Sequence, residues 1–341
     1  MNGAAPEARW GAIRVADVTV APGEVRDVWL PITRDPVPRP APVALRVVHG
    51  AQPGPALFVI AGLHGDELNG VGIVQRLMAQ PTHDMRGTLF LVPIANAYGF
   101  HERTRYLADG RDLNRCFPGD PHGSFASRLA ATLFDQIVRR SSAGIDLHTA
   151  PRWRANVPHV RINLAMPGGS LLVRGFGESI VLDDGSREGT LRRAAQHAHV
   201  PVLLFEAGDP FRFQADVIDR GWRGVRSVMV ALGMIGGRRR RVRYRVILKH
   251  THWIRAEQSG ILEMAVAPGD WLRAGTAVAT TSDAFGRERS VQISPYTGLV
   301  LGVTTHPSVN PGDPLCHIGV VKRAVPLLEK HLGPAKHVSG S

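Results

Sequence analysis

Apolar residues follow two distinct spacings in the first two thirds of the chain. Continuous apolar runs, which are typical of buried strands, lie at Leu57–Gly62, Thr88–Ile94, Ser142–His148 and Pro201–Glu206. Apolar residues at helical spacing, which are typical of amphipathic helices, lie at Gly70–Gln80, Ser124–Arg139, Thr190–Ala198 and Val217–Leu232. Because strands and helices alternate, the pattern predicts an α/β fold with a mostly parallel or mixed central sheet flanked by helices. The stretch between His148 and Thr190 shows no clear period before its last helix and is expected to be irregular.

The pattern changes after Gly237, where the helical spacing disappears. Residues 242–320 contain short strand-like segments separated by Gly, Pro and Asp, as in Pro268-Gly-Asp270. The segments 259–275 and 297–313 resemble each other loosely, which indicates an internal repeat. We therefore expect an α/β domain over residues 1–238, a small all-β barrel-sandwich-like domain over residues 239–322, and a tail over residues 323–341.

Three of the predicted strands end in side chains that bind metals or carry protons. The first strand leads into the segment GLHGDE, which contains His64 and Glu67, while the others end in His148 and Glu206. Open α/β sheets place their sites at the carboxyl ends of parallel strands, so these side chains are expected to meet at one edge. Two imidazoles and one carboxylate, with a fourth position left for water, form the ligand set of a catalytic zinc site.

Four motifs occur in order along the chain, namely GLHGDE, DLNRCFPG from Asp112, Asp146-Leu-His148 and Phe205-Glu-Ala-Gly208. Together they resemble the succinylglutamate desuccinylase/aspartoacylase family, a branch of the zinc carboxypeptidase-like hydrolases, over residues 20–320 or so. The resemblance implies that His64, Glu67 and His148 bind one zinc ion per chain and that Glu206 is the general base.

The same resemblance implies the roles of the substrate-binding residues. Asn114 and Arg115 match the pair that holds a substrate carboxylate, and the planar fork of an arginine suits such a group. Arg105, within Thr104-Arg105-Tyr106, matches a second arginine that would stabilise the oxyanion formed at the amide carbonyl. The C-terminal region resembles a biotinyl/lipoyl-like barrel without the carrier lysine, so we expect a structural module that closes over the site.

The supporting chemistry is consistent with these roles. Zinc would lower the pKa of a bound water toward ~7, and Glu206 would take its proton and pass it to the leaving amine. Asp146 lies two residues before His148 and therefore on the same strand face. We expect Asp146 to orient a ligand imidazole, with His64 the preferred partner. A hydrogen bond from a loop amide is the alternative role of Asp146.

Several arginines follow the strand that ends at His148. They are Arg152, Arg154 and Arg161. One interpretation is that they meet a second substrate charge or the acyl group, with Arg161 as our candidate, and the other is that they form a solvated basic loop. Both interpretations remain open at this stage.

The leading interpretation is a zinc-dependent amide hydrolase that removes an acyl group from a small anionic N-acyl amino acid. A metallocarboxypeptidase acting on a short peptide or an amino-acid conjugate is the alternative enzyme. A non-catalytic zinc-binding or basic nucleic-acid-binding module is the alternative from another class. Retention of Glu206 favours an enzyme, because a carboxylate that binds no metal has no other evident reason to end a buried strand.

Charge and cysteine content refine this interpretation. Of the net charge of +12, a large part lies in Arg238–Arg245, where charged and apolar residues alternate as in a solvated linker, so nucleic acid is not expected as a partner. The two cysteines, Cys116 and Cys316, are too few for a disulfide framework. With no signal-peptide pattern and no apolar run of ~18 residues, we expect a cytoplasmic protein without membrane contact, and we leave a homo-oligomer open.

Overall fold

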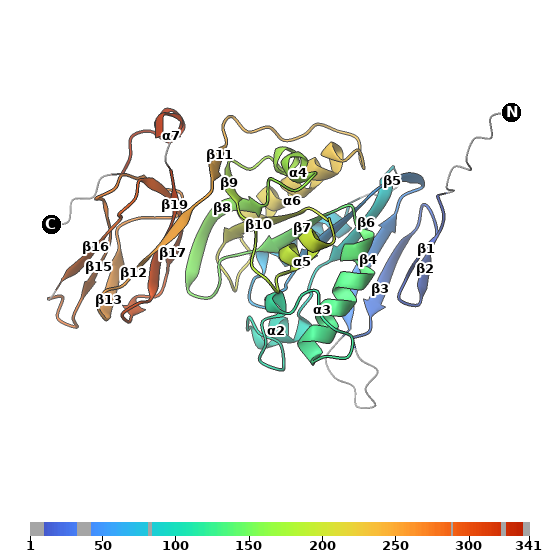
Figure 1. Ribbon diagram of the computed structural model, residues 1–341, viewed down its shortest axis with the longest axis horizontal. Coiled ribbons are helices and arrows are strands. Elements are labelled where there is room, and N and C mark those ends of the chain that lie inside the picture. The colour runs from blue at the N-terminus through green and yellow to red at the C-terminus, as the bar shows by residue number, and fades with distance from the viewer. Residues whose placement is uncertain (1–9, 33–41, 81–83, 288, 322–324, 337–341) are drawn as a thin grey trace.

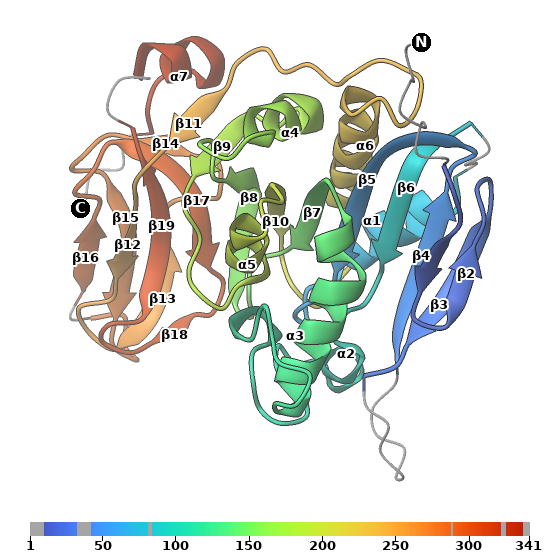
Figure 2. The same cartoon turned by 45° about the vertical axis from the view of Figure 1, so that its right-hand side comes forward.

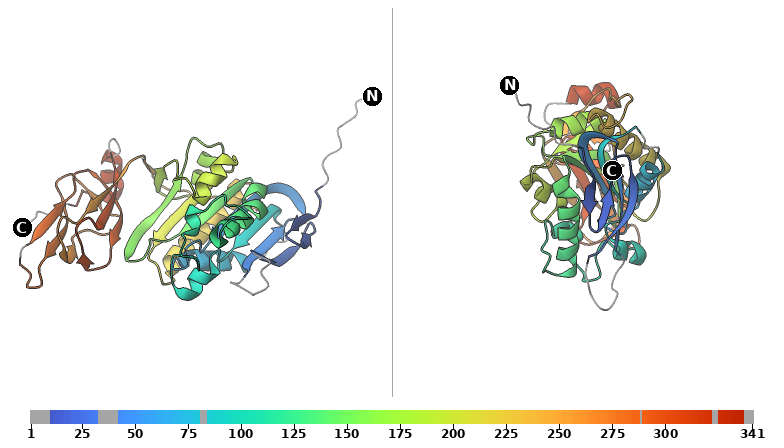
Figure 3. Two further views of the ribbon diagram at one scale, coloured as in Figure 1. Left: turned by 60° about the horizontal axis from the view of Figure 1, so that its bottom comes forward. Right: turned by 90° about the vertical axis from the view of Figure 1, so that its right-hand side faces the viewer.

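The computed structural model describes residues 10–32, 42–80, 84–287, 289–321 and 325–336. Within these ranges, 13 strands form one mixed sheet that runs along the long axis of the molecule (Figure 1). The N-terminal strands lie at one end of this axis and the C-terminal strands at the other (Figure 3). The predicted α/β fold with a mixed central sheet is confirmed.

The strands up to residue 208 are β1 (Ile13–Val15), β2 (Val18–Val20), β3 (Val25–Leu30), β4 (Val43–His49), β5 (Gln52–Ala61), β6 (Arg86–Val92), β7 (Ala143–His148), β8 (Arg154–Ile162), β9 (Ile180–Asp183) and β10 (Val202–Gly208). The helices up to residue 231 are α1 (Asn69–Met78), α2 (Ala97–Glu102), α3 (Phe125–Gln136), α4 (Gly169–Phe176), α5 (Leu191–His197) and α6 (Ala215–Ala231), with short 3₁₀ turns at Leu113–Arg115 and Val138–Arg140.

The centre of the sheet is parallel. Strands β10, β7, β5 and β6 are parallel neighbours in that order, while β8 and β4 pair with the two ends of this group in antiparallel fashion. The apolar runs predicted for the central strands therefore lie side by side. Their carboxyl ends meet at one edge of the sheet, and that edge carries the strand-end side chains predicted to form a site.

Helices cover both faces of the central strands. Alternate residues of β5 divide between two cores: Phe58 and Ile60 pack with α3 and α5, whereas Leu57 and Val59 pack with α1, α4 and α6. Figure 2 shows α3 and α5 in front of the sheet and α6 behind it. This two-sided burial explains why the central strands are continuously apolar.

The remaining elements are β11 (Val246–Leu248), β12 (Thr251–Arg255), β13 (Gly260–Met264), β14 (Trp271–Leu272), β15 (Ala277–Ser282), β16 (Ser290–Ile293), β17 (Gly298–Thr304), β18 (Ser308–Val309), β19 (Pro314–Val320) and α7 (Val325–Leu332). β17 pairs with β8, so β12, β19 and β17 continue the central sheet, while β13, β15, β16 and β18 form a second sheet. The short strands predicted after residue 242 are therefore present, and the domain boundaries stay a prediction.

Two stretches differ from the sequence-based expectation. Residues 154–183, expected to be irregular, contain β8, α4 and β9, because the polar cavity-facing residues of β8 hide its period. The segment expected to be a tail contains α7, whose Leu328 is buried in a core with Trp271. Residues 337–341 lie outside the described residues. No helix in the described part of the chain combines the length and apolarity needed to cross a membrane.

Candidate metal centre and active site

The first two candidate ligands lie in the turn between β5 and α1. The backbone of Gly62 adopts a φ of +63°, which favours glycine and turns the chain sharply after the strand. A Cβ at Gly65 would collide with the backbone of Gly99, so only glycine lets this turn pack against α2. His64 and Glu67 are thereby held in a buried turn, with exposed fractions of 3% each.

His64, Glu67 and His148 converge on one point. Nδ1 of His64 lies 2.7 Å from one carboxylate oxygen of Glu67, and Nδ1 of His148 lies 2.8 Å from the other. One donor atom from each residue lies within 4.8 Å of the others, and all three residues are buried. The predicted set is thus brought together, although its residues span 81 positions between Glu67 and His148.

Each of the two histidines also faces a second carboxylate through its other ring nitrogen. Nε2 of His64 lies 3.2 Å from Asp112, and Nε2 of His148 lies 3.0 Å from Asp146. A carboxylate at Nε2 favours the tautomer with the proton on that nitrogen, which leaves the Nδ1 lone pair for a cation. Two imidazole nitrogens and a carboxylate converging in a buried turn are a donor set that suits a zinc ion.

The pairing of Asp146 corrects one expectation. Asp146 was expected to orient His64, but it faces His148 on its own strand, and the carboxylate at His64 comes from Asp112. The reason is geometric: side chains two residues apart on β7 share a face, so Asp146 and His148 can meet without a contribution from another strand. Both oxygens of Asp146 and Nε2 of His148 are buried without an aligned hydrogen bond to any described residue.

The pKa shifts in this group follow from opposite charges packed in a buried turn. Burial raises the pKa of Glu67, but His64 and His148 outweigh it and lower the pKa well below its ordinary value. Burial likewise raises the pKa of Asp112, while His64 and Arg105 lower it further than burial raises it. Both carboxylates are therefore ionised at neutral pH, as a cation site requires.

Arg105 is tied to the same group. Its guanidinium donates to Asp112 at 2.9 and 3.1 Å and to Glu67 at 3.2 Å. The predicted oxyanion-stabilising arginine therefore lies directly beside the candidate metal ligands and lines the same cavity.

Glu206 lies next to this group on the neighbouring strand. In the parallel register of β10 and β7, Glu206 is opposite His148. The amide of Asn156 donates to one carboxylate oxygen of Glu206 at 3.1 Å, and the guanidinium of Arg161 lies 3.7 Å from the other. The carboxylate is held from two sides, yet it keeps 15% of its surface exposed toward the cavity.

Asn114 and Arg115 lie on the 3₁₀ turn that follows Asp112. The side-chain oxygen of Asn114 accepts a hydrogen bond from the backbone N–H of Leu191 at 2.9 Å, which ties this turn to the start of α5. The Arg115 side chain is 47% exposed, and the Asp112 carboxylate lies as far as 4.0 Å from its guanidinium. The guanidinium therefore remains accessible to a ligand. Both residues line the cavity.

A cavity of about 680 Å³ joins these groups. Its lining includes every predicted site residue, namely His64, Glu67, Arg105, Asn114, Arg115, Asp146, His148, Arg161 and Glu206. It also includes residues to which the sequence analysis gave no role, among them Asn156, His159, Asp184, Arg192, Thr251, Trp253 and His317. No element after residue 240 was expected to supply individual side chains to the site, since no motif marks Trp253 or His317.

Strand β8 contributes side chains to the cavity from before and after an irregularity in its pairing with β10. Glu206 on β10 pairs with His159, whereas Gly208, two residues later, pairs with Asn156, three residues away on β8. The extra residue in β8 reverses which side chains face the cavity. Asn156 and Arg161 can therefore both line it, although strict alternation would put them on opposite faces.

Arg161 is neutralised by its neighbours. Its guanidinium donates to Asp184 at 2.6 and 3.0 Å, and Asp184 also accepts from Arg192. Together with its contact to Glu206, these bonds make Arg161 part of a charged network that lines the cavity. The candidate role of Arg161 in binding a second substrate charge stays a prediction, and its contacts give it a second task of holding Glu206.

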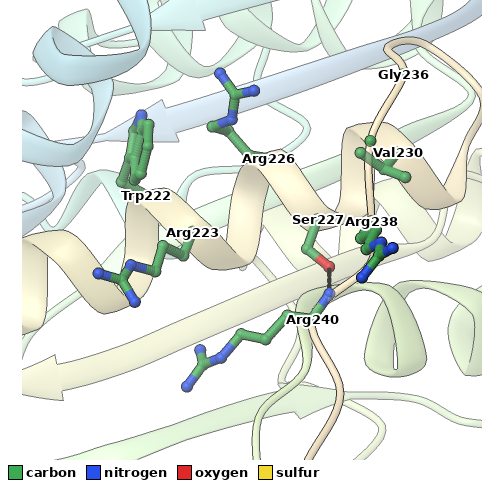
Figure 4. Close-up of a pocket in the computed structure, with 9 residues that line it drawn as sticks. Trp222, Arg223, Arg226, Ser227, Val230, Gly236, Arg238 and Arg240 are labelled. Atoms are coloured by element: carbon green, nitrogen blue, oxygen red, sulfur yellow. Dashed lines mark hydrogen bonds between the residues drawn. The ribbon is translucent and has the colours of Figure 1, made fainter.

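The basic run Arg238–Arg245 lies away from this cavity. The backbone N–H of Arg240 donates to Ser227 at 2.6 Å, and the Arg245 side chain donates to the carbonyl of Glu178 at 3.3 Å. A second cavity of about 290 Å³ lies between α6 and the start of this run. Its side chains do not converge on one point: Trp222 and Arg226 point to one side of α6, and Arg223 and Arg240 to the other (Figure 4).

Comparison with known proteins identifies the family of the chain and agrees with its fold. Residues 53–232, slightly more than half of the chain, match the family described as succinylglutamate desuccinylase/aspartoacylase catalytic domain. N-alpha-acetyl-L-2,4-diaminobutyric acid deacetylase from Halomonas elongata is 26% identical over 261 residues, which cover 67% of this chain and 71% of that protein.

Solved structures share the fold over most of the chain. A succinylglutamate desuccinylase from Silicibacter sp. superposes with a TM-score of 0.78 at 21% identity, covering 87% of this chain and 95% of that one. The product-bound ectoine utilization protein EutE (DoeB) from Ruegeria pomeroyi superposes with a TM-score of 0.77 at 20% identity, covering 88% of this chain and 99% of that one.

Proposed function

The chain belongs to the succinylglutamate desuccinylase/aspartoacylase family, a family of amide-bond hydrolases, and from this premise we propose that it is a zinc-dependent deacylase of N-acyl amino acids. The observation that carries the proposal is the buried convergence of His64, Glu67 and His148 beside Glu206 at the edge of one sheet. The relative from Halomonas elongata is named as a deacetylase of an N-acetyl amino acid, which supports the same reaction class.

The three converging residues would hold the metal. Zinc bound there would supply a water of lowered pKa, near ~7, and a positive charge for the substrate carbonyl. Asp112 and Asp146 lie at the Nε2 atoms of the two imidazoles, which leaves the Nδ1 atoms directed toward Glu67 as the candidate ligand nitrogens. Arg105 offsets the excess negative charge of Glu67 and Asp112.

Glu206 would be the proton carrier. It accepts the proton of the attacking water and delivers it to the amine nitrogen, after which the carbon–nitrogen bond breaks and a carboxylic acid and a free amine leave. Asn156 and Arg161 hold the carboxylate from two sides, which limits the orientations it can adopt. Because the Glu206 carboxylate forms its hydrogen bond with Asn156 and its ion pair with Arg161, and none with His64, Glu67 or His148, it remains available for this role.

The remaining residues would bind the substrate. Arg115 is exposed to the cavity and can donate two hydrogen bonds to one substrate carboxylate, with the amide of Asn114 beside it. Arg105 would donate to the oxyanion on the carbonyl oxygen at the cost of one of its present carboxylate contacts.

Cys116 and Cys316 are both free, which supports the expected cytoplasmic location.

The test is a metal analysis combined with a substrate panel. Zinc-loaded protein is assayed with N-acyl amino acids and with dipeptides, and His64→Ala is compared with His197→Ala, an exposed histidine outside the cavity. We expect hydrolysis of N-acyl amino acids, and loss of zinc and activity only in His64→Ala. Cleavage of dipeptides alone would favour the carboxypeptidase alternative, and zinc binding without any hydrolysis would favour a non-catalytic module.

A further inference from the structure

Six arginines line the cavity, and three of them form close ion pairs with carboxylates. Arg105 pairs with Asp112 and Glu67, while Arg161 and Arg192 pair with Asp184. Arg154 differs from these three, because its guanidinium forms no hydrogen bond or ion pair with any described residue, a property that it shares with Arg187. Arg154 lies instead over the ring of Trp253, 4.6 Å from the ring centroid. The guanidinium of such an arginine can donate hydrogen bonds to an anion that enters the cavity.

The position of Arg154 on β8 brings it close to the reacting groups. Arg154 lies two residues before Asn156 on the same strand, so the two side chains project from one face. Asn156 is the residue that donates to Glu206 at 3.1 Å. Burial lowers the pKa of Arg154, as do the charges of Arg255 and Arg105, and together they outweigh the opposite effect of the Asp313 carboxylate.

Strands from the C-terminal region support this guanidinium. Trp253 on β12 and His317 on β19 are opposite each other in the antiparallel register, and their rings stack with centroids 4.3 Å apart and planes 5° apart. Burial, together with His159, Arg161 and Arg154, lowers the pKa of His317 to about 3, so the ring is neutral at physiological pH. A neutral stack presents a flat face to Arg154 without adding a competing carboxylate.

We propose that Arg154, held on the Trp253–His317 stack, binds a second carboxylate of the substrate and thereby determines specificity. The proposal rests on the proposed deacylase function, in which Arg115 binds the first carboxylate. It assigns a binding role to an arginine of β8 and a positioning role to two side chains of the C-terminal strands. We call Arg154, Trp253 and His317 the aromatic wall of the cavity.

The second carboxylate has two chemical sources that the wall would recognise alike. It can end the acyl group, as in an N-succinyl amino acid, or it can belong to the amino-acid side chain, as in N-acetylaspartate. Two substrate pairs separate these sources: N-succinylglycine against N-butanoylglycine, and N-acetylaspartate against N-acetylasparagine. Each pair changes one carboxylate while keeping the size of the molecule nearly constant.

The experiment compares zinc-loaded wild type with Arg154→Gln, Arg154→Lys and Arg152→Gln. The Arg152→Gln variant is the control, because it removes the same charge two residues away. The Arg152 side chain stacks on Trp153 and lies outside the cavity lining. For at least one pair, we expect Arg154→Gln to lower kcat/KM of the charged member by roughly 10- to 100-fold, the range for a hydrogen bond to a charged group. The neutral member should change little, Arg154→Lys should retain part of the preference, and Arg152→Gln should match wild type.

The proposal is overturned if Arg154→Gln lowers kcat/KM equally for both members of each pair. It is also overturned if the wild type hydrolyses neither charged member in preference to its neutral counterpart. Calorimetric binding of succinate against butanoate supplies a readout without turnover. Succinate should bind more tightly than butanoate, and Arg154→Gln should abolish the difference while its melting temperature stays close to wild type. If no substrate is hydrolysed, the proposed deacylase function is wrong. The anion site is still tested by calorimetry, because equal binding of succinate and butanoate would refute it.

Discussion

The two ends of the cavity are built on different principles. At one end, which we call the metal end and which comprises the candidate ligands His64, Glu67 and His148 with Asp112, Asp146 and Arg105, carboxylates face imidazole nitrogens or the guanidinium across 2.7–3.2 Å. At the aromatic wall, Arg154 rests on a ring and forms no ion pair or hydrogen bond with a carboxylate among the described residues, although the charge of Asp313 acts on it from a distance. The metal end is therefore organised before a ligand arrives, whereas the wall holds a charge whose partner must come from outside.

The difference teaches where substitutions should act. A change at the metal end removes one member of a coupled set and leaves other buried charges unpaired, so its effect should be large and independent of the substrate. A change at the wall removes an interaction with one part of the substrate, so its effect should depend on the substrate's charge. The following experiments test this contrast, from the largest expected effect to the smallest.

Substitution of a metal ligand should have the largest effect. His148→Ala should reduce bound zinc from one per chain to near zero and lower kcat/KM beyond the ~10²–10⁴-fold that a single acid–base group contributes. Plasma emission spectrometry measures the zinc, and full zinc in this variant would refute the ligand assignment. The loss should be equal for charged and neutral substrates, which separates it from a change at the wall.

Glu206→Gln should retain zinc and lower kcat on the order of 10²–10⁴-fold, because the amide cannot carry the proton. Its matched control is Glu263→Gln, an exposed glutamate on β13, which should keep wild-type turnover. Steady-state kinetics at saturating substrate, with zinc content measured on the same samples, decide the matter. Near wild-type turnover in the first variant would remove Glu206 from the mechanism.

The carboxylates behind the histidines should have smaller effects. Asp112→Asn and Asp146→Asn should each weaken zinc binding or activity by about 10- to 100-fold, because each histidine loses the partner that sets its tautomer. Asp17→Asn, a change at an exposed aspartate near the N-terminus, is the control. Competition with a chelator measures the affinity. If only one of the two cavity variants loses affinity, the symmetric arrangement of the two histidines is wrong.

Arg115→Ala should raise KM and change kcat little, because an anchor held equally in ground and transition states acts on binding. A loss of roughly 10- to 100-fold in kcat/KM is expected from a hydrogen bond to a charged group. Arg115→Lys should recover little, since an ammonium cannot replace the planar fork. Arg111→Ala in the same loop is the control, and equal cleavage of amidated and free-acid substrates would contradict the anchor.

The smallest effect is expected at the support of the wall. Trp253→Phe keeps an aromatic face but weakens its attraction for the guanidinium, so the preference for a doubly charged substrate should fall about two- to fivefold. Trp253→Leu should reduce it further. The measured quantity is the ratio of kcat/KM for the two members of a substrate pair, and a change in kcat alone would place Trp253 in a different role.

The fold and the candidate ligands could be predicted from particular residues. Apolar runs such as that of β5 have few alternatives to a buried strand, and glycines such as Gly62 and Gly65 mark a turn that larger residues would not fit. Strand β8 escaped prediction because its cavity-facing side is polar and its register is irregular. Helix α7 escaped because its short amphipathic pattern buries one residue, Leu328, against a distant core.

The sequence by itself determined which residues are the candidates for binding a metal and carrying the proton. His64, Glu67, His148 and Glu206 end apolar runs, and parallel strands bring such ends to one edge. Only the tertiary structure decided how the charges are paired. That Asp112 faces His64 and Asp146 faces His148, and that Arg161 is neutralised while Arg154 rests on Trp253, depends on distances between side chains far apart along the chain. Coulomb and hydrogen-bond energies change steeply over such short distances, so no pattern along the chain can substitute for them.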